Sequence, residues 1–302
     1  MKQRSFELSL ERGDLLPLLM MLPTLLVIVF MMAAPLCYGF FLSFFNARFG
    51  VSDYAESFAG IDNYIRFFKD PAAYKAIFNT LYFSFGAIAG DFVLGTLCAV
   101  FLVKIPRLVA AVLRPIVTIP LLVSPVVVGL IWRYIYDPMG ILYWFLGIFG
   151  LGMKEFPGVT AASTSMLSVI IAHWWQVTPF IIIVLTAGLL SIPEEYYEAA
   201  KIDGAGAFSI FFRITLPQLR NVYMVIMLIS GVDTVKVFDI IYSLTGGGPN
   251  NSSISLSIYA YSQGFEQSNL SYSMAISFMT MLITFLVFGI PFARHNLGRG
   301  NG

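Results

Sequence analysis

A polar stretch, residues 191–217, separates two long apolar segments and reads SIPEEYYEAAKIDGAGAFSIFFRITLP. Ser191 is followed three residues later by Glu194, a spacing that predicts a capping box at the start of a helix. Pro193 suits the first turn of the same helix, where a missing N–H costs nothing. Glu198 places negative charge toward the positive end of the helix. The sequence therefore predicts that a helix begins at the edge of this stretch.

The end of that helix is predicted at Asp203-Gly204, because glycine adopts the left-handed backbone conformation at low cost. A second short helix is expected through Phe208 and Phe212, with Pro217 as its end. The sequence therefore predicts a pair of helices joined at a glycine. The first helix would expose acidic side chains, and the second would expose phenylalanine side chains. Residues 191–220 are called the elbow below.

The composition around the elbow is that of a membrane protein. The chain has 302 residues, of which 58% are hydrophobic and 12% charged, and its mean hydropathy is +0.81. Soluble domains carry about 25% charged residues. The net charge of +1 argues against a nucleic-acid partner, which would need a basic face. Cys37 and Cys98 lie in apolar runs and are interpreted as small buried apolar residues.

Six segments are long and apolar enough to cross a bilayer, which takes about 20 residues. These segments are residues 15–45, 76–103, 115–136, 161–190, 221–244 and 269–293. The first is longer than the roughly 7–15 apolar residues of a signal peptide, so it is interpreted as a retained helix. Pro17, Pro23 and Pro35 predict kinks within it. The expectation is an all-α polytopic membrane protein with an N-terminal segment 1–14, a transmembrane domain 15–293 and a tail 294–302.

The distribution of Lys and Arg predicts the orientation of these spans. Eleven basic residues lie in the N-terminal segment, the connection 104–114, the elbow and the tail, against six in the opposite set of loops. Both termini and the elbow are therefore expected in the cytoplasm. Residues 62–69, in a loop on the other side, are expected to form either a short helix at the membrane surface or a solvated loop.

At the elbow the chain resembles the permeases of ABC importers. Their EAA motif is matched by Glu198-Ala199-Ala200, by Gly204 and by Ile214-Thr215-Leu216-Pro217. The resemblance implies that the elbow docks in a groove of an ATPase subunit. Glu198 would face basic groups, the two alanines would allow close approach, and Gly204 would set the bend. The residues assigned to ATPase coupling are Glu198, Ala199, Ala200, Asp203, Gly204, Phe208, Arg213, Ile214, Leu216 and Pro217.

The resemblance also implies a fold, partners and a location. The fold would be the transmembrane domain of a type I ABC importer, in the inner membrane of a bacterial cell. Its partners would be a second homologous permease forming a heterodimer, two ATP-binding-cassette ATPase subunits and an extracytoplasmic solute-binding protein. ATP and Mg would be bound by the ATPases, with no cofactor in this chain. The permease would supply a gated pathway and no catalytic residue.

Further matches resemble the carbohydrate-uptake branch, which implies a sugar or sugar-like solute. They include Asp203-Gly204-Ala205 and the loop Thr245–Asn250, TGGGPN. That loop has no Lys-Ser/Thr after its glycines, so it is not a phosphate-binding loop. The residues expected to contact the binding protein are Gly246, Gly247, Gly248, Pro249 and Asn250. A merely flexible loop is the alternative.

Polar and aromatic residues inside the spans are the candidates for a solute pathway, because polar groups are costly in lipid. The candidates are Asp91, Trp132, His173, Trp175, Gln176, Asp233, Lys236, Asp239 and Tyr242. On a continuous helix Lys236 would lie between the two aspartates of its span. Those three residues are expected either to contact solute or to form ion pairs between helices or subunits.

Span four supplies His173 and Gln176 on one helical face, with Trp175 on another. An aromatic ring beside an amide could line a sugar pathway, while packing or anchoring at the interface is the alternative for Trp174 and Trp175. Asp91 is expected to face either a cavity or the partner permease.

Two other classes of protein compete with this interpretation. An ion-coupled secondary transporter could use the intramembrane carboxylates, but such proteins usually show repeated halves with paired broken helices. A membrane-embedded enzyme is weaker still. His173 and His295 are the only histidines, and the sequence shows no catalytic triad and no metal cluster.

Overall fold

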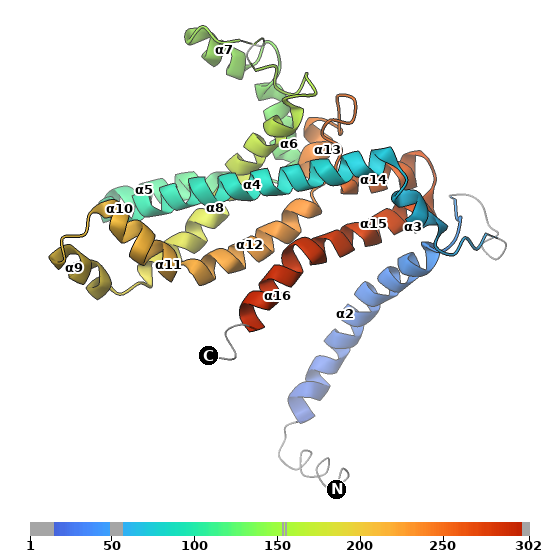
Figure 1. Ribbon diagram of the computed structural model, residues 1–302, viewed down its shortest axis with the longest axis horizontal. Helices are drawn as coiled ribbons and strands as arrows, with labels where there is room; N and C mark the ends of the chain where they lie inside the picture. The colour runs from blue at the N-terminus through green and yellow to red at the C-terminus, as the bar shows by residue number, and fades with distance from the viewer. Residues whose placement is uncertain (1–14, 49–56, 153, 155, 298–302) are drawn as a thin grey trace. The chain divides into compact units, whose positions relative to one another are not determined.

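The computed structural model describes residues 15–48, 57–152, 154 and 156–297. Within these ranges every regular element is a helix, and β-type pairing is limited to one isolated bridge between Phe45 and Phe58. The predicted all-α class is therefore confirmed (Figure 1). The predicted N-terminal segment 1–14, and Arg299 of the tail, lie outside the described residues.

The chain divides into two compact units. One comprises the residues up to Arg66 together with Gln263–Ala275, and the other comprises Phe67–Ser262 and the residues from Ile276 onward. The first unit contains α2 (Leu15–Leu42) and α3 (Asp62–Phe67) except for its last residue. The second contains the helices that carry most of the candidate site.

Helix α2 is continuous, with Pro23 and Pro35 inside it. Its apolar side chains from Leu19 onward are mostly exposed within this chain. Cys37, on α2, and Cys98 are also exposed, so the prediction that both are buried was wrong. The sequence pattern misled because an apolar environment in a membrane protein includes lipid and partner subunits as well as the chain's own core. Of the two alternatives for residues 62–69, a short helix and a solvated loop, the structure contains the helix, α3. Its position at a membrane surface stays a prediction.

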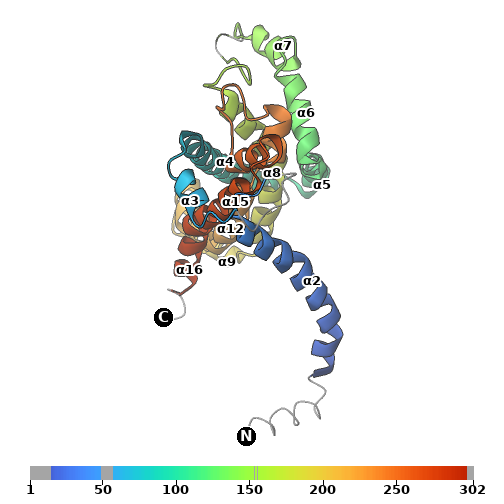
Figure 2. The ribbon, with the colours of Figure 1, turned by 90° about the vertical axis from the view of Figure 1, so that its right-hand side faces the viewer.

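The core of the second unit is formed by α4 (Pro71–Lys104), α8 (Ser165–Leu190) and α12 (Arg220–Val235), which pack side by side (Figures 1 and 2). The side chain of Asp70 accepts a hydrogen bond from Ala72 N at the start of α4. A cluster of buried apolar residues fills the space between the three helices. It contains Ala99, Leu102, Ile181, Ile182, Leu185, Leu189, Ile192, Leu219 and Ile226.

Small residues on α4 allow α8 to come close. A β-carbon added at Gly90 would lie 2.0 Å from Cε2 of Trp174, and one at Gly95 would lie 2.6 Å from Cγ2 of Ile181. Gly86 faces Ile170 in the same way. The run Gly86-Ala-Ile-Ala-Gly90 is a small-xxx-small pattern typical of close helix pairs in membranes.

The third predicted span differs from expectation. A helix, α5 (Arg107–Thr118), already begins inside the predicted connection 104–114 and continues into the 3-10 turn η1 (Ile119–Leu122). After a bend of 98° the chain forms α6 (Pro125–Ile135) (Figure 2). The break falls before Pro125, because proline disfavours helical geometry in the residue preceding it.

The fifth predicted span, 221–244, is also divided. Helix α12 ends at Val235, and α13 (Asp239–Leu244) begins after a break of three residues. Four helices in the described part of the chain are long and apolar enough to cross a membrane, or five if the bent pair counts as one span. The boundaries of six spans therefore remain a prediction.

The remaining elements are short or complete the C-terminal part. They are α7 (Ile141–Ile148), α9 (Glu194–Ile202), α10 (Ala207–Ile210), the π-helix η2 (Phe211–Thr215), α11 (Leu216–Gln218), α14 (Leu256–Tyr261), the π-helix η3 (Ser262–Glu266), α15 (Leu270–Thr284), the π-helix η4 (Phe285–Gly289) and α16 (Ile290–Leu297).

Candidate functional site

The elbow contains the predicted glycine stop. Asp203 caps α9, and Gly204 follows with a φ of +75°. Ala205 N donates to Ala200 O at 2.9 Å, and Gly204 N donates to Lys201 O at 3.0 Å. These two bonds form a Schellman motif, which satisfies carbonyls at the end of a helix. A β-carbon at Gly204 would have no atom within 4 Å, so glycine is favoured here by its backbone conformation and not by lack of space.

Two predicted details of the elbow were wrong. Ser191 does not cap α9: it ends α8, and its hydroxyl donates to Gly188 O at 2.7 Å. Pro217 does not end the second helix, which passes through the π-helix η2 and α11. Proline lacks the N–H that would bond the carbonyl four residues earlier, and a widened turn precedes it, in which Leu216 N donates to Phe211 O.

The outer side of the elbow exposes both motif residues and bulky apolar residues. Glu198, Ala199, Asp203 and Gly204 are exposed, whereas Ala200 is buried. Ile202 is 86% exposed and Phe208 is 82% exposed. Among the other predicted residues, Arg213 and Pro217 are exposed, while Ile214 and Leu216 are partly buried.

Exposed apolar side chains of this size favour a protein partner over water. Ile202 was not among the predicted residues, although an isolated isoleucine at the end of a polar helix is a signal that could have identified it.

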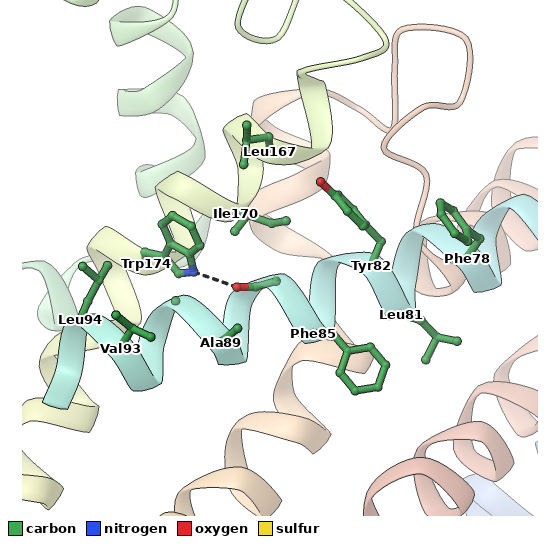
Figure 3. Close-up of a pocket in the computed structure, with 12 residues that line it drawn as sticks. Phe78, Leu81, Tyr82, Phe85, Ala89, Val93, Leu94, Leu167, Ile170 and Trp174 are labelled. Carbon is green, nitrogen blue, oxygen red and sulfur yellow. Dashed lines mark hydrogen bonds between the residues drawn. The ribbon is translucent and has the colours of Figure 1, made fainter. Parts of the chain in front are cut away.

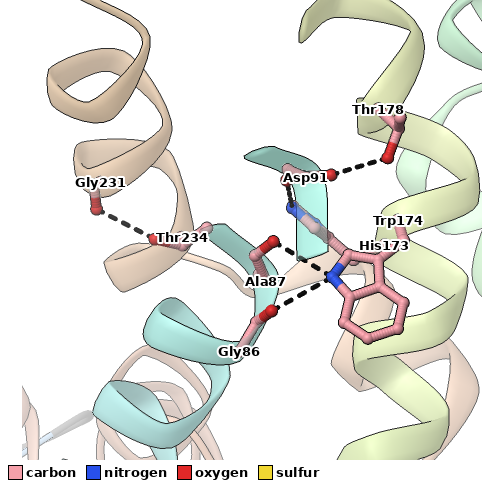
Figure 4. Close-up of polar contacts among 8 residues, drawn as sticks. All are labelled: Gly86, Ala87, Asp91, His173, Trp174, Thr178, Gly231 and Thr234. Atoms are coloured by element: carbon pink, nitrogen blue, oxygen red, sulfur yellow. Dashed lines mark hydrogen bonds and ion pairs between the residues drawn. The ribbon is translucent and has the colours of Figure 1, made fainter. Parts of the chain in front are cut away.

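Asp91 lies at the centre of a polar cluster between α4 and α8 (Figure 4). It is 0% exposed, and each of its carboxylate oxygens has a partner. His173 Nε2 lies 3.2 Å from Oδ2, and Thr178 donates its hydroxyl to Oδ1 at 2.9 Å. The rings of His173 and Phe83 also pack edge to face, with ring centroids 5.2 Å apart. The structure therefore brings Asp91 and His173 together inside this chain.

The adjacent Trp174 forms part of the same helix contact. Its Nε1 donates to Gly86 O at 3.2 Å and to Ala87 O at 3.1 Å (Figure 4). It lines an apolar groove of about 850 Å³ along α4 and α8, together with residues such as Phe85 and Leu167 (Figure 3). This geometry supports packing for Trp174, one of the two roles considered from sequence.

Trp175 points elsewhere, as its position in the helix predicted. Its ring lies 6.3 Å from that of Trp132 on α6, in an edge-on arrangement. The indole N–H of Trp132 is buried and has no hydrogen-bond partner among the residues that the structure describes. Gln176 is buried and donates to Val123 O at 2.8 Å. It thus satisfies a carbonyl at the break between η1 and α6.

The charged residues near the end of α12 are exposed. Lys236 Nζ lies 2.7 Å from Asp233 Oδ1, and their side chains are 66% and 57% exposed. Asp239 lies beyond the break, at the start of α13. The prediction that Lys236 lies between two aspartates on one helix was therefore wrong, because that geometry required a continuous helix. Tyr242 stacks on Phe238, with ring centroids 5.0 Å apart.

Phe238 and Tyr261 were not identified from the sequence. Both contact Tyr242, and the three rings form an aromatic cluster beside the break. Tyr261 comes from α14, so only the fold brings it to this position.

The glycine-rich loop is held by the N-terminal part of α4. Gly246 and Gly247 have φ values of +59° and +86°. Lys75 Nζ donates to Asn250 O at 2.6 Å, and Asn79 Nδ2 lies 3.1 Å from both Asn251 O and Ile254 O. These bonds argue against the alternative of a merely flexible loop.

The chain combines long apolar helices with an exposed polar elbow. This combination is that of a helical protein embedded in a membrane. The chain belongs to the family described as binding-protein-dependent transport system inner membrane component, which matches residues 91–292. It is therefore a non-catalytic membrane component of a transport system. In the described part of the chain, no group of three or more His, Cys, Asp or Glu residues could hold a metal ion.

Its relatives match over most of their length. The trehalose/maltose transport system permease protein MalF of Thermococcus litoralis is 34% identical, over 88% of each chain. The multiple sugar-binding transport system permease protein MsmF of Streptococcus mutans is 32% identical, over 90% of each. A crystal structure of a bacterial ABC transporter involved in the import of the acidic polysaccharide alginate contains a chain of the same fold. It has a TM-score of 0.81 and 24% identity, and the match covers 98% of this chain and 99% of that one.

Proposed function

We propose that this chain is the permease subunit of an ATP-driven importer that moves a sugar or sugar-like solute across the bacterial inner membrane. A binding protein delivers the solute on the extracytoplasmic side, and two ATPase subunits act at the elbow. A second permease forms a heterodimer with this chain. ATP and Mg bind to the ATPase subunits. Relatives named for trehalose/maltose transport and for multiple-sugar transport support the class of solute.

The observation that carries this proposal is the exposed elbow with the EAA motif. Glu198 and Ala199 face outward, and Gly204 turns the chain between α9 and α10. Ile202 and Phe208 extend this surface with apolar area. An acidic and apolar surface of this kind suits a groove that is basic at its rim and apolar inside. Closure of the ATPases on ATP would move the elbow and so alternate the access of the pathway.

We place the solute pathway at the exposed residues near the break between α12 and α13. Asp233, Lys236 and Asp239 offer charged groups, and Tyr242 offers an aromatic face. Sugars present apolar faces edged with hydroxyls, which suits this combination. The buried residues Asp91, His173 and Gln176 form hydrogen bonds within the chain. Their role in the proposed pathway is to hold the helices in place, without contacting the solute.

The test is charge reversal at Glu198 in the complete transporter. Glu198→Lys is expected to abolish both solute uptake and the ATPase activity stimulated by the binding protein, because it places a cation against basic groups of the ATPase. The amount of subunit in the membrane should not change. Glu195→Lys makes the same change in charge on the same helix, outside the motif, and is expected to retain most of the activity. Normal coupling in Glu198→Lys, or equal losses in both variants, would contradict the assigned role.

A further inference from the structure

We propose that two polar connections, one at Asp91 and one at Asn79 and Thr80, form a mechanical link between the elbow and the glycine-rich loop through α8 and α4. Asp91, Thr178, Asn79 and Thr80 are then positioning residues: they transmit movement without touching solute or nucleotide. This inference rests on the proposed function, because it assigns a route by which the binding-protein side and the ATPase side communicate.

The first part of the link joins the elbow to α8. Helix α8 ends at Leu190, and α9 begins at Glu194, so only three residues separate them. Leu189, near the end of α8, and Ile192, within this junction, are both buried in the core cluster. A displacement of α9 therefore acts directly on the end of α8.

The second part joins α8 to α4. Both oxygens of Asp91 are occupied by side chains of α8, and the carboxyl group is fully buried. Separating the helices would leave a buried polar group without partners, which is costly in an apolar environment. Trp174 adds hydrogen bonds to Gly86 O and Ala87 O one turn away. The two helices are thus held together by polar bonds as well as by close packing (Figure 4).

The third part joins α4 to residues 251–256, which directly follow the glycine-rich loop Thr245–Asn250 and are bonded to it through Ser253. Asn79 donates to Asn251 O and Ile254 O, and the hydroxyl of Thr80 accepts from Leu256 N at 2.9 Å. Thr80 is fully buried, and Asn79 is nearly so. Helix α4 has 34 residues, which corresponds to about 50 Å at 1.5 Å per residue. It therefore spans the distance from this loop to the end of α8 as one rigid element.

The alternative route, along α12, is interrupted. Helix α12 also leaves the elbow and leads to the glycine-rich loop through α13. The chain is not helical between Val235 and Asp239, so this route contains a joint. A continuous helix transmits a displacement better than two helices that meet at such a joint.

Four threonine-to-valine variants test the link, since this substitution keeps the shape of the side chain and removes its hydroxyl. Thr178→Val removes a bond to Asp91, and Thr80→Val removes the bond from Leu256 N. Thr96→Val is a matched control on α4, because Thr96 pairs with Tyr223 of α12. Thr186→Val is a control on α8, because its hydroxyl has no partner among the described residues.

The four variants are compared in the reconstituted transporter with its binding protein. Thr178→Val and Thr80→Val are expected to lower the ratio of stimulated to basal ATPase activity by about fivefold. This factor corresponds to the free energy that one hydrogen bond typically contributes. Basal activity and the amount of assembled transporter should stay unchanged, which separates lost coupling from lost folding. For Thr178→Val, half-saturation by the binding protein should also be unchanged. The two controls should keep the wild-type ratio.

The result that overturns the link is a wild-type ratio in Thr178→Val and Thr80→Val, or an equal decrease in all four variants. Glu198→Lys in the same assay distinguishes this failure from failure of the proposed function. If Glu198→Lys abolishes stimulation while Thr178→Val and Thr80→Val match the controls, the elbow couples to the ATPase by another route. If Glu198→Lys retains stimulation, the proposed function itself is wrong.

Discussion

At the residue scale, Gly204 shows how one backbone conformation shapes the elbow. Its φ of +75° lies in the region that side chains with a β-carbon disfavour, and the space around it is open. Gly206, two residues later, has an ordinary φ of −73° and equally open surroundings. The two glycines therefore differ in backbone conformation and not in crowding.

This difference predicts opposite outcomes for the same substitution. Gly204→Ala should destabilise the elbow by about 1 kcal/mol, because alanine is strained in the left-handed region, and it should reduce stimulated ATPase activity several-fold. Gly206→Ala should leave that activity unchanged. The measurement is uptake and stimulated ATPase activity at equal amounts of membrane-inserted subunit. Equal activity in the two variants would show that the turn does not depend on glycine at position 204.

Lys236 carries a second prediction at this scale. Its ammonium group is mostly exposed and paired with Asp233, so it can exchange this partner for an anionic group of a solute. Lys236→Met should lower uptake of an acidic sugar by at least about tenfold, equivalent to ~1.4 kcal/mol, and should change uptake of a neutral sugar little. Uptake of labelled neutral and acidic sugars tests this, with Asp233→Asn as a control that keeps the cation. Unchanged uptake of every sugar taken up by the wild type would remove Lys236 from the pathway.

At the element scale, the contact between α4 and α8 depends on the absence of side chains. Gly95 packs directly against Ile181, which is fully buried. Because isoleucine is β-branched, its side chain cannot easily adopt another rotamer. The added methyl group of an alanine would approach both Cγ2 and Cβ of Ile181, the latter at 2.9 Å. The two helices would have to move apart to accept it.

Gly95→Ala should therefore destabilise the protein by about 1–3 kcal/mol, although alanine is the better helix former. Gly147→Ala on α7 places the same methyl group in open space and should be neutral or slightly stabilising. Thermal unfolding of the purified transporter in detergent measures the difference. A Tm for Gly95→Ala equal to that of the wild type would show that the α4–α8 contact has room to adjust.

At the scale of the whole molecule, much of the apolar surface is open within this single chain. Side chains along α2 are largely exposed, as are the apolar residues that α4 contributes to the groove beside Trp174, such as Phe78, Phe85 and Val93. Such areas are covered in a membrane by lipid or by other subunits. The proposed pathway between two permeases would account for the exposed charges at Asp233 and Lys236, which would be costly if they faced lipid.

The source of energy is a property of the whole assembly, and it separates this protein from an ion-coupled transporter. Uptake should persist in sealed cells whose proton gradient has been collapsed while ATP is maintained, because in the proposed function the elbow and not a carboxylate supplies the coupling. Depletion of ATP with the gradient intact should stop uptake. The opposite pattern would favour coupling through intramembrane carboxylates such as Asp233.

The sequence by itself determined the features that neighbouring residues encode. The apolar runs fixed the all-helical membrane class, and Asp203-Gly204 located the end of α9, because a helix stop depends on the conformation of a few adjacent residues. The motif around Glu198 likewise identified the family. Ser191 was misassigned because its spacing fits a cap of α9 as well as the end of α8.

Only the tertiary structure decided what the isolated polar residues do. Asp91 and His173 are 82 positions apart, and Gln176 bonds a carbonyl 53 positions away. No local pattern contains such partners, since helix packing selects them. The break after Val235, which separates Asp239 from Lys236, was hidden for a related reason: an apolar run looks continuous in sequence whether or not its helix is. Local backbone conformation depends on neighbouring residues in the sequence. Burial and hydrogen-bond pairing depend on residues that are distant in the sequence and are brought together by helix packing.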